Sequence, residues 1–468
     1  MSGEFTANLL ERCSEEILRE VVELIERLHG QGSELCGYAE VEALEQEIGA
    51  IVGRLGALLM QEKLQEAARS KELQEQEGAF IKQLPGRWVS EGYREVAIRT
   101  RWGEIRIEMR YFRRKSRSTK ARGKGLYPAQ VLWGITEGCT PQLGSQASAL
   151  VAVVGSLSEA REVLRSWGVH LNVKSLRALA YGWARRARAL QAQTAHFPCP
   201  EQLDGRSVVV STDGGRIRIR ADKRGPRTAK KRRRYHTHWR EPKLLILYEV
   251  DEQGRSKPTF APLIDGTLKG PDTLGALLCY YLGRLAAQQA SKILFVADAA
   301  AWIWKRVPWI IELLGLAADR VLQLIDFYHA VEHLGKAAAG CARWSAAQRR
   351  RWVRARRGEL LKGQIDLVIE ALKALSQRRA AVRIEYRYFL RHRDRMQYAK
   401  IRNLGLPIGS GAVESAVRRV INLRLKGASI YWRDDSAEAM LMLRAFYKAW
   451  RWNLLKDMAL CPEAACHA

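Results

Sequence analysis

Three aspartates stand at points of this sequence where a carboxylate is costly to bury. Asp213, Asp298 and Asp326 each close a short run rich in apolar residues. An ionised carboxylate at the end of a buried strand needs a partner, and a metal ion is an economical one. Hard oxygen ligands suit Mg²⁺ or Mn²⁺. Two such ions about 4 Å apart can hold a scissile phosphate, activate water and stabilise the leaving oxygen.

The apolar runs predict the strands that position these aspartates, at residues 208–212, 293–297 and 321–325. Their composition is typical of strands that are buried on both faces. If the first two are neighbours in one sheet, Asp213 and Asp298 meet at its carboxyl edge. The competing interpretation is helix capping, which for Asp326 is as plausible as a role in the site. His329, on the helix expected next, is either a site residue or a hydrogen-bonded core histidine.

A fourth acid is predicted on a helix much further along the chain. Residues 341–400 have the pattern of very basic helices, and Gly409-Ser410-Gly411 then forms a loop. Ser410 can cap a new helix whose first turn or two contains Glu414, and Arg418 shares the face of Glu414 one turn later. The helix would return to the sheet after an insertion. A solvent-exposed helical Glu is the alternative interpretation.

The order of these features resembles a known family. The motifs that carry the resemblance are Ser211-Thr212-Asp213-Gly214, Ala297-Asp298-Ala299 with Trp302-Ile303-Trp304, Asp326-Phe327-Tyr328-His329 with Glu332-His333, and Gly409-Ser410-Gly411-Ala412-Val413-Glu414-Ser415. Over residues 200–455 the chain is similar to DDE transposases of bacterial insertion sequences, of the kind distantly similar to Mutator-like transposases.

The resemblance implies a ribonuclease-H-like catalytic core with a helical insertion. It implies that Asp213, Asp298 and Glu414 are the catalytic residues and hold two Mg²⁺ (or Mn²⁺) ions. Asp326, His329 and Arg418 are candidate accessory residues.

Cysteine usage departs from the family pattern. Relatives often carry paired Cys after the hairpin, where this chain has Arg113-Arg114-Lys115. We therefore expect no zinc there. The eight Cys are scattered, without a Cys-x-x-Cys pair, as is typical of a reducing compartment.

The charge balance favours a polyanionic partner. The chain has 78 Lys and Arg against 50 Asp and Glu, a net charge of +28. Residues 1–80 hold 17 Glu, no Asp and 7 Lys or Arg, a net of −10, so the remainder carries +38. The acidic segment is predicted to be a helical hairpin over about 8–29 and 40–76, or a dimerisation arm. A generally sticky, ribosome-like basic protein is the alternative for the rest.

Several basic regions are candidates for DNA contact. Alternation over 95–109 predicts a hairpin, and residues 110–124 after it form either a nucleic-acid-facing ribbon or a solvated loop. A helix starting at Ser156 or Ser158, a turn at Gly168 and a basic helix from Val173 have the helix-turn-helix pattern, which many helical hairpins share. The individual DNA-binding candidates are Lys174, Arg177, Arg185, Lys231, Arg232, Arg233, Arg350 and Arg351.

The sequence thus predicts an α/β protein preceded by helical and helix-turn-helix DNA-binding regions. The expected parts are an acidic helical region (1–83), a basic hairpin region (84–140), a helix-turn-helix region (141–200), the first part of the catalytic core (201–335), a basic helical insertion (336–403) and the last part of the core (404–468). No apolar run reaches the roughly 18 residues of a membrane helix, and the start does not have the pattern of a signal peptide. We expect a cytoplasmic, nucleoid-associated bacterial protein.

The predicted function is DNA transposition. The chain would bind the terminal repeats of an element and target DNA as a homodimer or larger assembly, because two ends must be joined. It would catalyse metal-dependent strand cleavage and strand transfer. The alternatives are an inactive or domesticated DNA-binding relative, and a nuclease or resolvase on the same fold.

Overall fold

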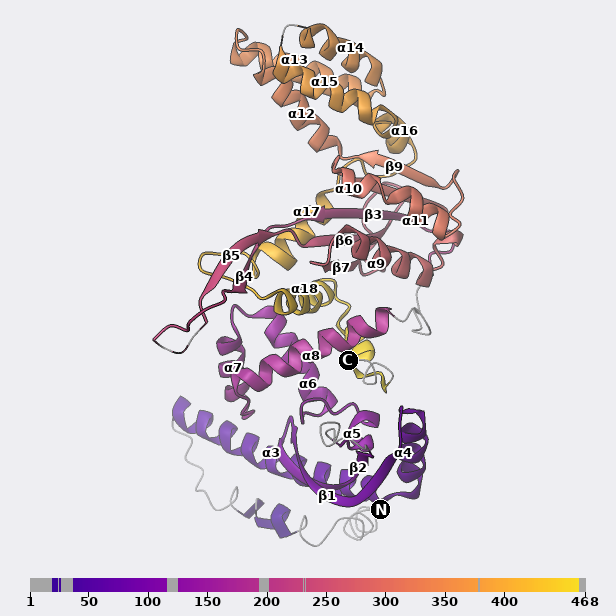
Figure 1. Ribbon diagram of the computed structural model, residues 1–468. Coiled ribbons are helices and arrows are strands. Elements are labelled where there is room, and N and C mark those ends of the chain that lie inside the picture. Colours follow the sequence, from indigo (N-terminus) through magenta and orange to yellow (C-terminus); the bar gives the residue numbers. More distant parts are fainter. Residues whose placement is uncertain are drawn as a thin grey trace. The chain divides into compact units, whose positions relative to one another are not determined.

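The computed structural model describes residues 19–23, 25–26, 37–115, 125–192, 202–229, 231, 233–377 and 379–462 (Figure 1). It divides into two compact units, Met1–Leu190 with Lys456–Ala468, and Gln191–Leu455. The predicted helix over 8–29 lies mostly outside the described residues. Among the described helices, none combines the length and the apolar composition that a bilayer crossing requires.

The first unit begins with helices and a long hairpin. Its elements here are α3 (Tyr38–Arg69), α4 (Lys71–Gln83), β1 (Trp88–Thr100) and β2 (Gly103–Arg114). The predicted helix over 40–76 is therefore two helices, because Ser70 leaves the helical conformation and its hydroxyl caps α4 by accepting from Leu73 N–H at 3.1 Å. The predicted hairpin is confirmed, with Ile98 opposite Ile105 and both buried.

Five further helices follow around this hairpin or close the chain: α5 (Pro128–Leu132), α6 (Pro141–Val153), α7 (Leu157–Ser166), α8 (Val173–Ala192) and α19 (Trp452–Leu460). The predicted helix, turn and helix over 156–192 are confirmed as α7 and α8. Ser156 caps α7, since its hydroxyl accepts from Glu159 N–H at 3.1 Å. Gly168 ends the turn with φ of +77°, a conformation that glycine adopts without strain.

The second unit is built on a mixed five-stranded sheet. Its strands are β3 (Ser207–Gly214), β6 (Lys243–Val250), β7 (Leu263–Thr267), β8 (Lys292–Ala297) and β9 (Val321–Ile325). The order is β7-β6-β3-β8-β9. β6 is antiparallel to β3 and β7, whereas β3, β8 and β9 are parallel. The three predicted apolar strands are thus the parallel half of the sheet.

Two strands of this unit were not predicted. β7 is one of them, and β5 (Tyr235–Arg240) is the other; β5 pairs with β4 (Ile217–Asp222) in a separate two-stranded ribbon. β5 lies in a stretch rich in basic residues, 222–240, whose composition is typical of a loop. The five residues from Tyr235 to Trp239 are all exposed, so no apolar alternation marks the strand.

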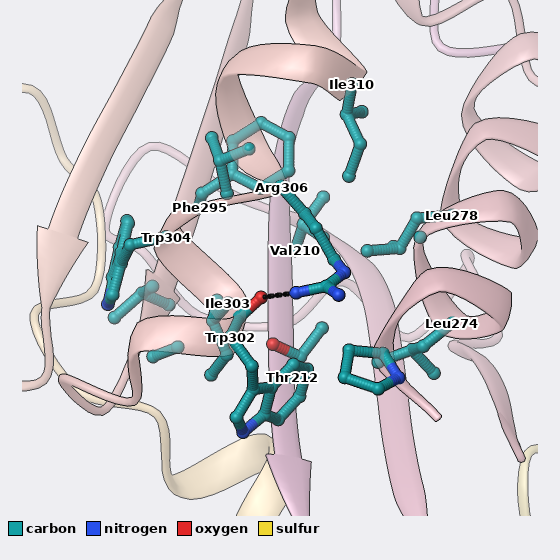
Figure 2. Close-up of a pocket in the computed structure, with 15 residues that line it drawn as sticks. Val210, Thr212, Leu274, Leu278, Phe295, Trp302, Ile303, Trp304, Arg306 and Ile310 are labelled. Atoms are coloured by element: carbon teal, nitrogen blue, oxygen red, sulfur yellow. Dashed lines mark hydrogen bonds between the residues drawn. The ribbon is translucent and has the colours of Figure 1, made fainter. Parts of the chain in front are cut away.

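Helices cover the sheet on both faces. α9 (Pro271–Arg284), α10 (Ala301–Trp304) and α11 (Val307–Leu313) enclose a small apolar pocket against Val210 of β3 and Phe295 of β8, as Figure 2 shows. A short 3₁₀ turn, η2 (Ala287–Gln289), follows α9. Thr212 lines the same pocket, two residues from Val210. Because side chains alternate along a strand, Asp213 faces the other side of the sheet.

That other side receives the last helices of the unit, α17 (Gly411–Val417), a π-helical turn η4 (Arg418–Asn422) and α18 (Asp434–Lys448). α17 packs on β3 and β6, and α18 packs on β7. Between β9 and α17 stands the predicted basic insertion, which Figure 1 shows as a bundle beyond β9. It comprises α12 (Phe327–Ala339), α13 (Ala346–Leu361), α14 (Ile365–Ser376), α15 (Ala380–His392), η3 (Arg393–Arg395) and α16 (Tyr398–Asn403).

Candidate active site

The sheet brings two of the predicted aspartates to one edge. Asp213 is the second-last residue of β3, and Asp298 directly follows β8. β3 and β8 are adjacent and parallel, so both residues lie at the carboxyl edge. One oxygen of each carboxylate accepts from a nearby backbone N–H, that of Gly214 for Asp213 (2.6 Å) and that of Ala300 for Asp298 (3.0 Å).

Asp213 is electrostatically coupled to both other predicted catalytic residues. Burial raises the pKa of Asp213 to about 6, and the hydrogen bond from Gly214 opposes that rise. The negative charges of Asp298, Glu414 and Glu241 raise the pKa of Asp213 further. Asp298 and Glu414 therefore act electrostatically on Asp213, although the three acids are separated by 85 and 116 positions in sequence.

Glu414 reaches this environment from α17. Ser410 occupies the N-cap position, but its side chain makes no capping hydrogen bond, so that detail of the prediction is wrong. The Glu414 side chain is exposed, whereas α17 itself is held on the sheet by buried Val413 and Ala416. Arg418 begins the π-helical turn and forms no ion pair with Glu414 in the described structure.

The three carboxylates have no cationic partner among the described residues, although the chain holds 78 Lys and Arg. In the pairing of β3 with β6, the cation nearest to Asp213 is Lys243, which lies opposite Gly214. Its ammonium lies 2.9 Å from Glu241 Oε1 and 4.1 Å from the centre of the Trp302 ring, so it is already engaged. Mutual repulsion at the site is thus left uncompensated by protein cations.

The donor chemistry fits a divalent metal ion, since carboxylate oxygens are the ligands that Mg²⁺ and Mn²⁺ prefer. The distances between the three carboxylates fit a shared metal ion less well. In the part of the chain that the structure describes, no three His, Cys, Asp or Glu side chains stand close enough together to hold a metal ion. Side chains must move together for Asp213, Asp298 and Glu414 to share one ion.

Asp326 acts as a helix cap and also joins separate parts of the chain. It is 2% exposed, and its Oδ1 accepts from His329 N–H at 2.8 Å at the start of α12. Its Oδ2 accepts from the N–H of Ser410, the residue before α17. Its own N–H donates to Ala297 O at 2.8 Å, next to Asp298. The capping interpretation of Asp326 is confirmed, and the same carboxylate joins the start of α12 to the residue before α17.

His329 belongs to a hydrogen-bonded cluster within the insertion. Its Nε2 lies 3.4 Å from His333 Nε2, and His333 Nδ1 lies 2.5 Å from Glu385 Oε2 on α15. The Tyr388 ring stacks on His333 with centroids 3.7 Å apart. Burial lowers the pKa of His333, opposed by the Glu385 carboxylate. This geometry agrees with the interpretation of His329 as a hydrogen-bonded histidine.

Sequence reasoning missed three residues around the site. Lys243 begins β6 and Glu241 lies two residues before it, and only the sheet pairing brings them beside the end of β3. Tyr388 comes from the insertion. Burial raises its pKa, and so do the negative charges of Asp298 and Asp326. Its hydroxyl is buried without a partner in the described structure. No local sequence signal marks any of the three.

The pocket in Figure 2 lies on the opposite face of β3 from Asp213. It has a volume of about 20 Å³, room for about one water molecule, and is lined mainly by apolar side chains. The hydroxyl of Thr212 is buried there without a partner, and Arg306 Nη1 donates to Trp302 O at 2.7 Å. Trp304 is 6% exposed, so it serves as packing.

The predicted DNA-binding cations are exposed wherever the structure describes them. Arg232 lies outside the described residues. The others stand on three separate elements: Lys174, Arg177 and Arg185 on α8, Lys231 and Arg233 between β4 and β5, and Arg350 and Arg351 on α13. None of these seven forms a hydrogen bond or ion pair with the three carboxylates in the described structure, so they are candidates for DNA binding and not for catalysis.

The comparisons with known proteins give no family. No protein-family model matches the chain. No curated protein matches its sequence.

Proposed function

We propose that this chain is a metal-dependent DNA transposase of the DDE type. One observation carries the proposal: the negative charges of Asp298 and Glu414 raise the pKa of Asp213 at the carboxyl edge of the sheet, and none of the three acids has a cationic partner in the described structure. In a chain with a net charge of +28, leaving three acids uncompensated favours a bound cation as their partner.

The sheet supports a ribonuclease-H-like core. β3, the strand with the first acid, is central. On one side of it β6 pairs antiparallel with β3 and β7 pairs antiparallel with β6, and on the other side β8 and β9 run parallel to β3. This is the layout expected from the family that the sequence resembles. The helical insertion and the Glu-bearing α17 follow in the expected order.

Asp213, Asp298 and Glu414 would hold Mg²⁺ or Mn²⁺, which when bound activates water and stabilises the leaving oxygen of a phosphodiester. The chain's own residues orient the carboxylates. Gly214 and Ala300 N–H groups orient two of the carboxylates, and Asp326 fixes where α17 starts. No nucleophilic side chain is required, because water and then a freed 3′ hydroxyl act as nucleophiles.

The DNA partners follow from the same proposal. α7 and α8 would read the terminal repeat as a helix-turn-helix, with Lys174 and Arg177 exposed at the start of α8. Arg350 and Arg351 on α13 would contact phosphates of flanking or target DNA. Joining two ends calls for at least two copies of the chain. An enzyme that acts on DNA in a bacterium would be associated with the nucleoid.

The test uses purified full-length protein, Mg²⁺ and a labelled duplex taken from the DNA flanking the gene. Wild type is expected to nick the element end and join it to target DNA. Asp213→Asn should abolish nicking and keep DNA binding, because it removes a metal ligand and leaves the basic surfaces intact. Asp319→Asn is the matched control; Asp319 is exposed at the opposite edge of the sheet, before β9.

Three results would contradict parts of this proposal. Normal nicking by Asp213→Asn means that the catalytic assignment is wrong. Nicking without any strand joining favours a nuclease or resolvase. Tight binding of ends without nicking by wild type, in Mg²⁺ or Mn²⁺, favours an inactive DNA-binding relative.

A further inference from the structure

The β4–β5 ribbon presents one face rich in arginine and aromatic residues. β4 and β5 pair antiparallel, with Arg218 opposite Trp239 and Asp222 opposite Tyr235. Residues directly opposite each other share a face of the ribbon. Ile217 and Ile219 are buried on the other face. The ribbon thus has one side with the buried Ile217 and Ile219 and an opposite side with Arg218, Arg220, Asp222, Tyr235, Thr237 and Trp239.

The arginines of that opposite side lie over aromatic rings. The guanidinium carbon of Arg218 is 5.3 Å from the ring centres of both Trp239 and Tyr431, and that of Arg220 is 5.7 Å from the ring centre of Tyr235. Trp239 is 49% and Tyr235 43% exposed. Stacking restricts both guanidinium groups. Arg218 Nη2 also donates to Gly427 O at 3.3 Å, whereas the Arg220 side chain has no hydrogen-bond acceptor in the described structure. Guanidinium groups held in this way are pre-positioned to bind phosphate oxygens.

A groove of about 1030 Å³ opens at the outer end of the ribbon. Seven of the residues that line it are cations, namely Arg220, Lys223, Arg227, Lys231, Arg233, Arg234 and Arg433. Asp222 is its one described acid, and Arg433 already pairs with Asp222 at 3.2 Å. The other six cations form no ion pair with a carboxylate of the described chain. The positive charge of the groove is therefore largely not neutralised by carboxylates of the described chain.

The ribbon is fixed relative to the candidate active site. Trp432 joins the free edge of β4, since its N–H donates to Arg218 O at 3.0 Å and its carbonyl accepts from Arg220 N–H at 2.8 Å. Figure 1 shows the ribbon extending past the end of β3. Arg220 stands seven residues after Asp213, so at about 3.3 Å per residue it lies at most about 23 Å away.

We propose that the β4–β5 ribbon clamps the phosphate backbone of duplex DNA within one helical turn of the phosphate held at Asp213. The inference rests on the proposed function and adds a partner surface to its site. A helical turn is about 34 Å long, so a ribbon at most about 23 Å from the site contacts the same turn. A two-stranded ribbon also has the width that the major groove admits.

Binding is measured on the full-length chain carrying Asp213→Asn, by fluorescence anisotropy at several salt concentrations. The probes are a labelled duplex of about 30 base pairs, roughly three turns, and one of its strands alone. The test variant is Arg220→Gln/Arg234→Gln. The control is Lys292→Gln/Arg320→Gln, which removes the cation that begins β8 and the one directly before β9, at the sheet edge opposite to Asp213. Thermal unfolding verifies that both variants fold.

The ribbon variant should bind the duplex roughly ten- to sixtyfold more weakly at 0.1 M salt, and the slope of log affinity against log salt should fall by about 2. The control should change neither. Trp239→Ala should weaken binding several-fold with little change in slope, because it removes the stacking and no charge. An unchanged slope in the ribbon variant, an equal loss in the control, or a larger loss on the single strand than on the duplex would overturn the proposal.

The two proposals fail in distinguishable ways. If wild type never nicks but the ribbon variant lowers the salt slope, the duplex clamp holds and transposition is wrong. If wild type nicks and joins DNA while the ribbon variant binds like the control, the clamp alone is wrong.

Discussion

Replacing Asp213 by Asn should make the metal-free protein more stable at neutral pH. Burial and neighbouring carboxylates raise the pKa of Asp213 from 3.8 to about 6. The folded state therefore binds more protons than the unfolded state between these pH values. The stability that protonated Asp213 contributes is lost as the pH rises through about 6. Asn mimics the protonated acid without titrating.

The magnitude follows from the pKa shift. About 2.2 units correspond to about 3 kcal/mol at a pH well above 6, since each unit is worth about 1.4 kcal/mol. Asp213 is partly exposed, so solvent screening reduces the expected gain to roughly 1–2 kcal/mol. For a unit of this size that corresponds to a rise of roughly 2–5 °C in the Tm.

The assay is thermal unfolding in EDTA at about pH 8 and about pH 4, with Asp319→Asn as the matched control. The gain of Asp213→Asn should appear at pH 8 and be mostly lost at pH 4, where the wild-type acid is protonated in the folded state and about half protonated in the unfolded state. Asp319 is exposed, and its substitution should change the Tm little at either pH. Added Mg²⁺ should then stabilise wild type and not Asp213→Asn, because a ligand stabilises only the state that binds it.

A loss of stability for Asp213→Asn at pH 8 would refute the claim that this carboxylate is strained by its surroundings. An equal gain at both pH values would show that the effect is packing and not charge. Equal stabilisation of both proteins by Mg²⁺ would place the ion elsewhere.

Three further outcomes can be measured on the same protein. Asp326→Asn should lower the free energy of unfolding by about 2–4 kcal/mol in a denaturant titration, because an amide accepts only one of its two backbone hydrogen bonds; the exposed Asp272→Asn should cost under about 0.5 kcal/mol. Burial lowers the pKa of His392 to about 4, so stability should fall as the pH drops below 6.5, by up to about 3 kcal/mol, and His392→Gln should flatten that dependence. Trp183→Phe should cost about 1–3 kcal/mol in the same titration, since it removes the 2.9 Å bond from the buried indole N–H to Thr136 Oγ1.

The parallel strands were predictable from sequence because they are buried on both faces. Apolar runs at 208–210, 293–297 and 321–325 leave few alternatives to a strand, and an acid after each marks where the chain leaves the core. The edge strand β7 and the ribbon strand β5 were not predictable in this way. β7 contains Asp265, fully buried and bonded to the Tyr281 hydroxyl at 2.7 Å, so its pattern contains a polar residue that only tertiary contacts satisfy.

The three candidate acids of the site could be named from the sequence, whereas the charged and polar residues around them could not. Asp213, Asp298 and Glu414 come together because β3 and β8 pair and α17 packs on β3, as their order in the sequence indicated. Glu241 reaches Asp213 only through the antiparallel pairing of β6 with β3. Tyr388 reaches Asp298 through the folding of the insertion. Both depend on long-range pairing that no local pattern encodes.

Asp326 explains how a long insertion can stand between two residues of one site. Phe327 N–H donates to Ile408 O at 3.0 Å, and the Asp326 carboxylate accepts from Ser410 N–H. The first and last residues of the insertion are therefore joined at its base, beside the end of β8. A side chain at Gly409 would meet the Tyr328 ring at 2.8 Å, so glycine permits this close approach. Because the base is closed, the start of α17 and hence Glu414 are positioned by residues 326–328 and 408–411, and the basic helices beyond them can contact DNA without setting the geometry of the carboxylates.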